Sequence, residues 1–429
     1  MSSRILVINQ YFPPDIASTG HIVEAVCEGI AARGAWVTAI VGQPSYATQI
    51  PDAQVQESRG RLTIRRIPMG RYRGRGNLMV RVLGYMRFLC GAWLASRRQV
   101  RPDAVVTFHN PPLLGLLGAL LARGYGVPFV YVVQDIHPDI LERTGRPRLP
   151  KWLIAIWRRL SRITLHKATL TITLSNAMKD YLVQTYGLVE ERVISIPLWA
   201  QPDLAHLPMD ADATKHARDA LALRVSSCDD LVVLYAGNMG VMHPVEVLVL
   251  AAARVRSSPI SFLFVGDGAK RPELERMCAE LSLEKVHFLP FQSSREFELL
   301  IQAADVCAVA LQTGLEDLCL PSRTSTFMSA GRPILAVMSD RAPQSRELTQ
   351  MGAGWCADSV EGVARLLESL VEAPDRMVVA GSAARSLHRL RYRRETLVRR
   401  YVDAVLEIAT RGADVPRTSQ PHSRPTRIG

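Results

Sequence analysis

A single carboxylate in a loop, followed by a helix start and a buried strand, is the pattern in this sequence best suited to chemistry. Residues 314–338 read GLEDLCLPSRTSTFMSAGRPILAVM, with Glu316 in the loop and a helix predicted over residues 324–330. We expect Ser and Thr side chains to cap the first amides of that helix, and Gly331 and Pro333 to end it. Because helix N-termini attract anions, the segment predicts an anion site overhung by Glu316.

Four other loops with polar or glycine-rich sequence follow predicted strands. They read YFPPDIASTG at 11–20, QDIHPD at 134–139, GNMG at 237–240 and GDGAKR at 266–271. Ligands of parallel sheets bind at the carboxyl ends of the strands, so we expect these loops to line the site. Their candidate site residues are Ser18, Thr19, Gly20, Asp135, His137, Gly237, Asn238, Gly240, Gly268, Lys270 and Arg271.

Some of these loops have an equally simple structural interpretation. Residues 11–20 could be a plain connecting loop, and Asp139 could cap the following helix while His137 only packs. Lys270 is different, because a cation at a helix start opposes the helix dipole and is better explained by an anionic ligand. The first strand lacks a following G-x-G-x-x-G, which argues against a dinucleotide enzyme.

The regions between the loops alternate short apolar runs with helical patterns, as in a parallel sheet wrapped by helices. In the first half, strands are predicted at residues 4–9, 36–41, 62–67, 104–107, 129–133, 170–174 and 193–196. In the second half, they are predicted at residues 231–236, 262–265, 286–289, 306–311 and 334–338. The expected fold class is therefore α/β, with two doubly wound sheets.

Composition limits the architecture and the environment. A chain of 429 residues with 48% hydrophobic side chains is long enough for two well-packed domains. Its seven cysteines are scattered and lack metal-ligand spacing, which is typical of reduced core residues. We see neither a targeting segment nor an uninterrupted apolar run that could cross a membrane. We therefore expect a cytoplasmic protein.

The excess of positive charge lies in the first half of the chain. Residues 1–200 hold 25 Lys and Arg against 12 Asp and Glu, a net of +13, whereas residues 201–429 hold 27 against 28, a net of −1. The basic segments 77–98 and 151–167 are amphipathic, so each could cover the sheet or lie on a membrane. The arginines that would face an anionic membrane are Arg81, Arg87, Arg158, Arg159 and Arg162.

The 314–338 segment resembles the donor-sugar loop of the large retaining glycosyltransferase family that assembles bacterial polysaccharides and glycolipids. Glu316, the Leu320–Pro321 pair and the GRPI run at 331–334 match that family's pattern, although Thr324 replaces its second glutamate. The Pro-Ser-Arg run at 321–323 matches a branch that builds surface polysaccharides. The loops at 237–240 and 266–271 resemble the family's two phosphate turns, and residues 198–202 resemble its domain junction.

The resemblance implies a GT-B fold, in which two Rossmann-like domains face each other across the active site. Residues 1–200 would form the acceptor domain, joined by a C-terminal helix at about 390–410, and residues 201–389 the nucleotide-sugar domain. Residues 411–429 would form a disordered tail. The implied reaction transfers a sugar from a nucleotide diphosphate sugar to a hydroxyl with retention of configuration, without a metal or another cofactor.

The resemblance also implies roles for the candidate residues. Glu316 would hold the hydroxyls of the donor sugar, Lys270 would neutralise the leaving diphosphate, and Asp135 and His137 would lie near the reacting sugar. The acceptor would be a lipid-linked saccharide at an anionic membrane face. The expected donor-binding residues are Gly237, Asn238, Gly240, Gly268, Arg271, Phe291, Leu320, Pro321, Ser322, Arg323 and Thr324.

Two other classes of function stay open on the sequence. The Thr at position 324 is the feature that favours a non-catalytic scaffold that binds sugar nucleotides. A nonhydrolysing sugar-nucleotide epimerase has a similar fold. Nucleic-acid binding is disfavoured, because the basic residues are not interleaved with exposed aromatic residues in a recognisable module.

Overall fold

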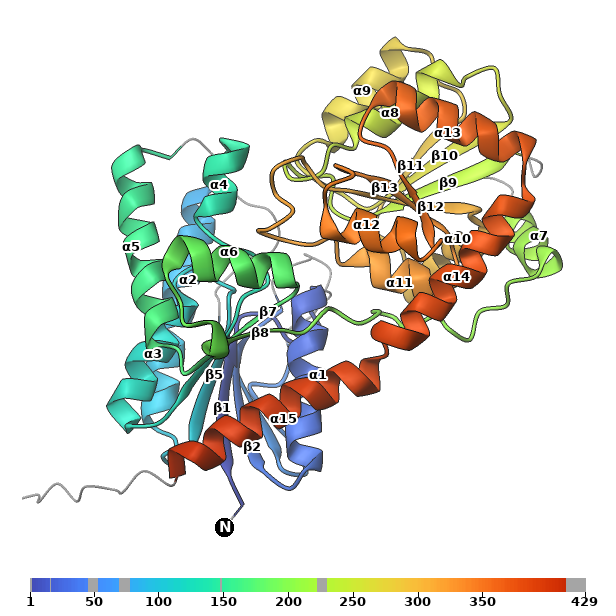
Figure 1. Ribbon diagram of the computed structural model, residues 1–429. Coiled ribbons are helices and arrows are strands. Elements are labelled where there is room, and N and C mark those ends of the chain that lie inside the picture. The colour runs from blue at the N-terminus through green and yellow to red at the C-terminus, as the bar shows by residue number, and fades with distance from the viewer. Residues whose placement is uncertain are drawn as a thin grey trace, which may run out of the picture.

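The computed structural model describes residues 2–15, 17–44, 53–68, 78–146, 149–221 and 230–413, which form two α/β domains (Figure 1). Each domain has its own sheet. The first sheet consists, in spatial order, of β3 (Gln56–Arg59), β4 (Leu62–Ile67), β2 (Trp36–Gly42), β1 (Arg4–Asn9), β5 (Ala104–Phe108), β6 (Phe129–Val132), β7 (Leu170–Thr173) and β8 (Val193–Ser195). All its neighbouring strands are parallel except β3, which pairs antiparallel with β4.

Helices cover both faces of this sheet. One face carries α2 (Leu78–Arg97), α3 (Leu114–Tyr125), α5 (Lys151–Lys167) and α6 (Asn176–Tyr186), and the other carries α1 (Ser18–Ala32). The short helices α4 (Asp139–Thr144) and η1 (Glu190–Arg192) lie in connections. The last helix, α15 (Arg394–Ala413), returns from the second domain to pack on α1 and β5 (Figure 1). The rest of the tail expected from residue 411, at 414–429, lies outside the described residues.

The second sheet is parallel throughout and has six strands, against eight in the first. Its spatial order is β11 (Val286–Leu289), β10 (Ile260–Val265), β9 (Leu231–Ala236), β12 (Val306–Ala310), β13 (Ile334–Val337) and β14 (Gly354–Cys356). Its surrounding helices are α7 (Ala211–Ala220), α8 (Glu246–Arg254), α9 (Arg271–Glu280), α10 (Ser294–Ala303), α11 (Arg323–Ser329), α12 (Pro343–Gln350), α13 (Val360–Glu372) and α14 (Asp375–Arg391).

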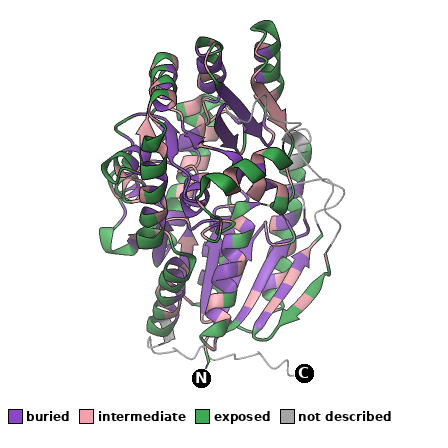
Figure 2. Cartoon of the chain, turned by 90° about the vertical axis from the view of Figure 1, so that its right-hand side faces the viewer, coloured by how far each residue is buried: buried purple, intermediate pink, exposed green. Residues whose placement is uncertain are grey.

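The central strands form where the sequence has unbroken apolar runs. Every residue of β5, β9, β10 and β12 is buried, as expected for strands with helices on both faces. Figure 2 shows this pattern as buried strands beneath helices whose outward faces are exposed. The predicted α/β class with two doubly wound sheets is confirmed. The prediction missed β3, a polar edge strand, and β14, which has only three residues.

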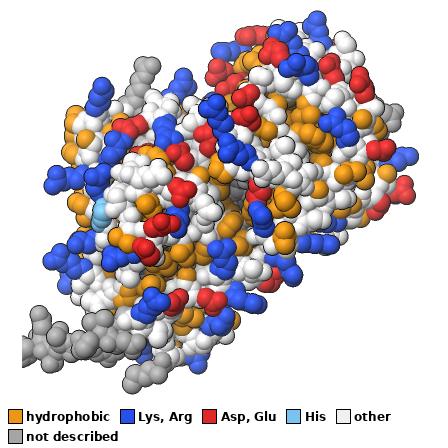
Figure 3. Space-filling view, in the orientation of Figure 1, with side chains coloured by type: hydrophobic (Ala, Val, Ile, Leu, Met, Phe, Trp, Pro, Cys, Tyr) orange, Lys and Arg blue, Asp and Glu red, His pale blue; other side chains and the backbone are white. Residues whose placement is uncertain are grey.

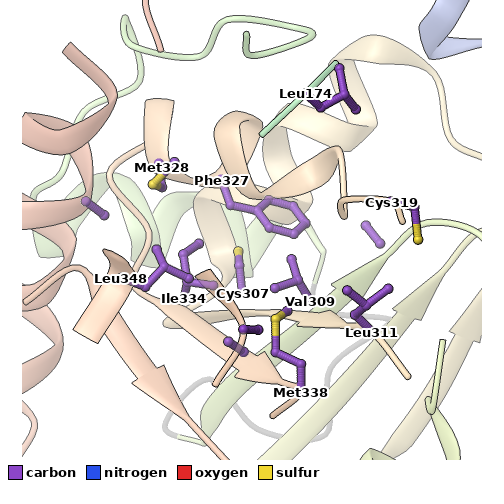
Figure 4. Packing of buried hydrophobic residues seen from close by; sticks show 14 of the residues in the cluster. Leu174, Cys307, Val309, Leu311, Cys319, Phe327, Met328, Ile334, Met338 and Leu348 are labelled. Atoms are coloured by element: carbon purple, nitrogen blue, oxygen red, sulfur yellow. The ribbon is translucent and has the colours of Figure 1, made fainter. Parts of the chain in front are cut away.

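The two domains share apolar packing where they meet. One cluster of buried side chains includes Leu174 from the first domain together with Leu318, Cys319 and Phe327 from the second. Figure 4 shows Leu174 above Phe327 in this cluster. The linker between the domains, near residue 200, packs on α15, because Trp199 lies edge-on against Tyr401 of that helix with ring centroids 5.9 Å apart. The loops at the domain boundary are therefore supported from both sides.

Helix α2 buries a different face from the one that its apolar pattern suggested. Its buried positions are Gly84, Phe88, Ala92 and Ser96, spaced four residues apart. The larger apolar side chains are exposed, with Leu83 at 54%, Met86 at 50% and Leu94 at 59%. Core packing of that larger stripe, one of the two alternatives for this helix, is therefore wrong. The side chain of Arg81 lies outside the described residues.

Candidate active site

The loop that carries Glu316 lies against the loop that carries Asp135, although the two belong to different domains. The backbone amide of Ile136 donates to the carbonyl of Leu318 over 3.0 Å. Beside this bond, Arg143 forms an ion pair with Asp317 and donates to the Gly314 carbonyl over 2.5 Å. Figure 3 shows the surface hollowed where the two domains meet. The structure thus joins the loop expected to hold the donor sugar to the loop expected to lie near the reacting sugar.

The loop position of Glu316 is fixed by the burial of neighbouring side chains and not by contacts of its own carboxylate. Leu315 and Leu318 are fully buried and hold the loop. The Glu316 carboxylate itself makes no hydrogen bond or ion pair with any of the described residues. A partly exposed carboxylate on a supported loop is available to accept hydrogen bonds from hydroxyl groups of a ligand.

The start of α11 is not capped as expected. Its N-cap residue, Ser322, has helical backbone angles and accepts no cap hydrogen bond. The hydroxyls of Thr324 and Ser325 instead donate backwards, to the carbonyls of Pro321 and Ser322. The prediction of side-chain capping was therefore wrong, because these hydroxyls satisfy carbonyls and not amides. Gly331 ends the helix in the left-handed region, at φ 69°, as expected.

Four of the residues expected near the donor lie at or just before the start of this helix. Thr324 is only 1% exposed, so its hydroxyl is turned into the protein. Arg323 donates to the Gln201 carbonyl over 3.1 Å and stacks on Phe297 at 4.8 Å. Leu320 and Pro321 are partly buried beside it. The structure thus ties Arg323 to the linker between the domains.

The two glycine turns of the second domain pack backbone against backbone. A Cβ atom on Gly268 would lie 2.2 Å from the Met239 carbonyl oxygen, and one on Gly266 would lie 2.3 Å from that of Gly237. The amide of Met239 donates to the carbonyl of Asp267 over 2.9 Å. Glycine is therefore required at 266 and 268 for the turns to meet.

These turns leave some backbone donors for a ligand. The amides of Gly237 and Met239 are bonded within the protein, whereas those of Asn238 and Gly240 donate to no group within the described parts of the chain. Asn238 is exposed. Two of the amides in this turn therefore remain able to bind an anion.

Lys270 reaches the same region but already has an anionic partner. Its ammonium group lies 2.9 Å and 2.8 Å from the two carboxylate oxygens of Glu246, in the first turn of α8, and donates to the His243 carbonyl over 3.0 Å. The neighbouring Arg271 donates to the Gly266 and Leu289 carbonyls and pairs with Glu275. Phe291, after β11, is 45% exposed.

Across the boundary, Asp135 is held by a histidine that the sequence analysis did not single out. The Nε2 atom of His109, after β5, lies 3.0 Å from the Asp135 carboxylate. Burial opposes ionisation of Asp135, but the hydrogen bond from His109 and the electrostatic interactions with His109, His137 and His243 outweigh it and lower its pKa. Asp135 therefore stays ionised at neutral pH.

His137 has the surroundings of a packed residue. Its ring lies 5.8 Å from that of Trp157, and its Nδ1 atom is buried without a partner. Burial lowers its pKa, against the opposing charge of Asp135. Asp139 does not cap α4, because its carboxylate accepts hydrogen bonds from Tyr181 and Tyr186 while Pro138 is the N-cap residue.

The first loop reaches the same edge of the sheet. The Thr19 hydroxyl donates to the Gln134 side chain over 3.0 Å. With the Gln201 amide oriented so that its oxygen accepts from Trp199, its nitrogen donates to the Ser18 carbonyl over 3.2 Å. Gly20 approaches the backbone of Phe12, 3.1 Å from where a Cβ would lie. Gly20 therefore packs closely against the backbone of its own loop.

Among the described residues, no group of three His, Cys, Asp or Glu side chains is placed to hold a metal ion. Metal independence stays a prediction. In the same part of the chain, no helix is both long and apolar enough to cross a bilayer.

His109, His243 and Glu246 are the site residues that sequence reasoning missed. His109 could have been noticed, because it follows a buried strand as Asp135 does. Glu246 carried no signal, since an acidic residue in a first helical turn is ordinary.

Comparisons with known proteins agree with this arrangement. Residues 19–199 match the model of the glycosyl transferase 4-like domain, and residues 230–402 match that of the glycosyl transferases group 1. The putative colanic acid biosynthesis glycosyl transferase WcaI of Escherichia coli (strain K12) is 27% identical over 343 residues, which cover 76% of this chain and 81% of the relative. The alpha-D-kanosaminyltransferase of Streptomyces kanamyceticus is 28% identical over 65% of this chain and 68% of its own.

Solved structures show the same fold. Sucrose-phosphate synthase from Thermosynechococcus elongatus superposes with a TM-score of 0.77 at 17% identity, covering 95% of this chain and all of that one. Anabaena Alr3699/HepE in complex with UDP-glucose gives a TM-score of 0.66 at 16% identity, covering 94% and 100%. The chain has two α/β domains, and each is matched by a glycosyltransferase domain model. Together with the shared fold of the solved structures, these matches show that this chain belongs to the GT-B glycosyltransferases of the group 1 family.

Proposed function

We propose that this glycosyltransferase moves a sugar from a nucleoside diphosphate sugar to a hydroxyl of a lipid-linked saccharide, in the assembly of a bacterial surface polysaccharide or glycolipid. The transfer retains anomeric configuration and needs no metal. The observation that carries the proposal is the hydrogen bond between Ile136 and Leu318, because it sets the Asp135 loop of one domain beside the Glu316 loop of the other.

The donor side has the groups that a diphosphate sugar requires. The free amides of Asn238 and Gly240, with Lys270 close behind them, suit the negative charge that grows on a leaving diphosphate. The unpaired Glu316 suits the hydroxyls of the sugar. The complex of Alr3699/HepE with UDP-glucose supports this class of donor, and the name of WcaI supports a role in polysaccharide assembly.

The acceptor side has a surface suited to a membrane. Helices α2, α3 and α5 lie on one face of the first sheet and contain Lys and Arg but no Asp or Glu. Trp152 and Ile156 of α5 are 65% and 48% exposed, and the exposed apolar stripe of α2 lies on the same face of the sheet, with α3 between the two helices. Figure 3 shows basic and hydrophobic side chains over this side of the first domain. Exposed apolar side chains among cations favour an anionic bilayer, where a lipid-linked acceptor would be found.

A panel of nucleoside diphosphate sugars, each incubated with a lipid extract or with soluble saccharides, tests the proposal. Release of nucleoside diphosphate together with labelled sugar in the lipid fraction is the expected result. Transfer to soluble saccharides alone would refute the lipid-linked acceptor. An epimeric free product would indicate an epimerase, and binding without turnover would indicate a scaffold.

A further inference from the structure

His243 occupies the junction between the phosphate-side turns and the domain boundary. Its Nδ1 atom lies 2.8 Å from the carbonyl oxygen of Ala310, at the end of β12. Because a carbonyl oxygen only accepts, Nδ1 must carry the hydrogen of this bond. The neutral ring therefore has its lone pair on Nε2, and only Nε2 can take up a further proton.

The cations expected to meet the diphosphate are all engaged within the protein. Both carboxylate oxygens of Glu246 contact Lys270. Arg271 is bound by Glu275 and by two backbone carbonyls, and Arg323 is bound to the Gln201 carbonyl. A diphosphate that enters this site thus meets cations whose charge is partly offset. It will draw a proton onto any suitable base nearby.

His243 is such a base. The charged groups that face it are Lys270, with its partner Glu246, from the second domain and Asp135 from the first. Asp135 in turn lies among His109 and His137. Burial lowers the pKa of His243 and Lys270 adds to this, while the bond to Ala310 and the charge of Asp135 oppose it. The ring is therefore neutral in the empty enzyme at neutral pH.

We propose that His243 takes up one proton from solvent at Nε2 when a nucleoside diphosphate sugar binds, and that the resulting imidazolium donates a hydrogen bond to the diphosphate. The histidine then supplies the positive charge that Lys270 shares with Glu246. As the bond to the sugar breaks and negative charge moves onto the diphosphate, this hydrogen bond strengthens, so His243 stabilises the departing nucleotide. The inference rests on the proposed donor class and adds a catalytic residue to it.

The pKa shift that this proton uptake requires is of a size that a nearby diphosphate can produce. A charge of opposite sign within about 4–6 Å shifts a pKa by roughly one to three units towards the charged form. An upward shift of that size brings an imidazole from below its usual pKa to above neutral pH. Binding should therefore be tighter at lower pH, with an affinity that falls as pH rises through the pKa of the bound state.

Titration calorimetry of the full chain with UDP-glucose, repeated in buffers of different ionisation enthalpy at one pH, measures the protons taken up. This probe is preferable to UDP, whose terminal phosphate itself titrates near neutrality. We expect an uptake approaching one proton for the wild type and none for His243→Gln. His243→Lys should bind without proton uptake, and its kcat/KM should lose the wild-type decline at high pH.

His287→Gln is the matched control, because burial also lowers the pKa of His287 but the residue lies on the edge strand β11. It should take up protons as the wild type does. Binding by the wild type without proton uptake, or unchanged uptake in His243→Gln, would overturn the role of His243. A complete lack of binding to UDP-glucose and to the other sugar nucleotides of the panel would overturn the proposed donor class as well.

Discussion

Replacing Lys270 by alanine should lower turnover strongly, and removing the charge of Glu246 should restore part of it. Loss of one preorganised group that meets charge in the transition state costs about 10²–10³-fold in kcat, or roughly 2.7–4 kcal/mol. In Lys270→Ala, the Glu246 carboxylate also loses its cation and is left facing the diphosphate. The fall in kcat/KM should therefore exceed that in kcat, because ground-state binding suffers too.

The size of the recovery follows from the geometry. At an effective dielectric constant of about 20, a unit charge about 6 Å from another is worth roughly 3 kcal/mol. The Glu246 side chain is 39% exposed, and solvent screening at such a site reduces this to about 1 kcal/mol, or about fivefold in rate. The double variant Lys270→Ala/Glu246→Gln should thus be about fivefold faster than Lys270→Ala.

Steady-state kinetics with the donor and acceptor that the panel assay selects, measured also for Glu246→Gln alone, complete a double-mutant cycle. Thermal unfolding is the control. An ion pair this exposed contributes at most about 1 kcal/mol to stability, so the melting temperatures should stay close to that of the wild type. Near-normal turnover in Lys270→Ala would show that Lys270 is outside the site. A double variant no faster than Lys270→Ala would show that Glu246 does not act on the diphosphate.

Three further predictions concern the site and the membrane. Glu316→Gln should lower kcat by about two orders of magnitude with little change in melting temperature, and a near-normal rate would remove Glu316 from the site. Addition of EDTA should leave activity unchanged, and loss that Mg²⁺ or Mn²⁺ restores would refute metal independence. The protein should co-sediment with anionic but not with purely zwitterionic vesicles, and salt should weaken this binding. Leu83→Ser/Met86→Ser should reduce it further, whereas Val378→Ser/Val379→Ser, which replaces residues of the second domain that are more exposed, should not.

The sequence predicted most strands of both sheets, because buried parallel strands have unbroken runs of apolar residues. Residues 231–236 and 286–289 were predicted with the bounds that β9 and β11 have. The prediction failed where the strand signal comes from a partner. β3 has the polar sequence QESR and is a strand only because β4 pairs with it. No local pattern reveals such pairing.

Helix α2 shows a second limit of the same kind. Its periodicity correctly predicted a helix, and its larger apolar residues were the natural choice for the buried face. The small residues Gly84 and Ala92 instead face the core with Phe88. A Cβ atom on Gly91 would lie 2.4 Å from Ile67, which shows how closely this helix approaches the sheet. The distance between helix and sheet, and hence the size of side chain that fits, is a tertiary property.

By itself, the sequence determined which loops gather at one edge of each sheet, because residues that follow parallel strands must lie at the same edge. It could not determine the partners of their side chains. The pairing of Lys270 with Glu246, the contact of Asp135 with His109 and the bond of His243 to Ala310 each join groups from separate elements. Those contacts are decided by how the helices and the two domains pack, and they set the charges that a ligand meets.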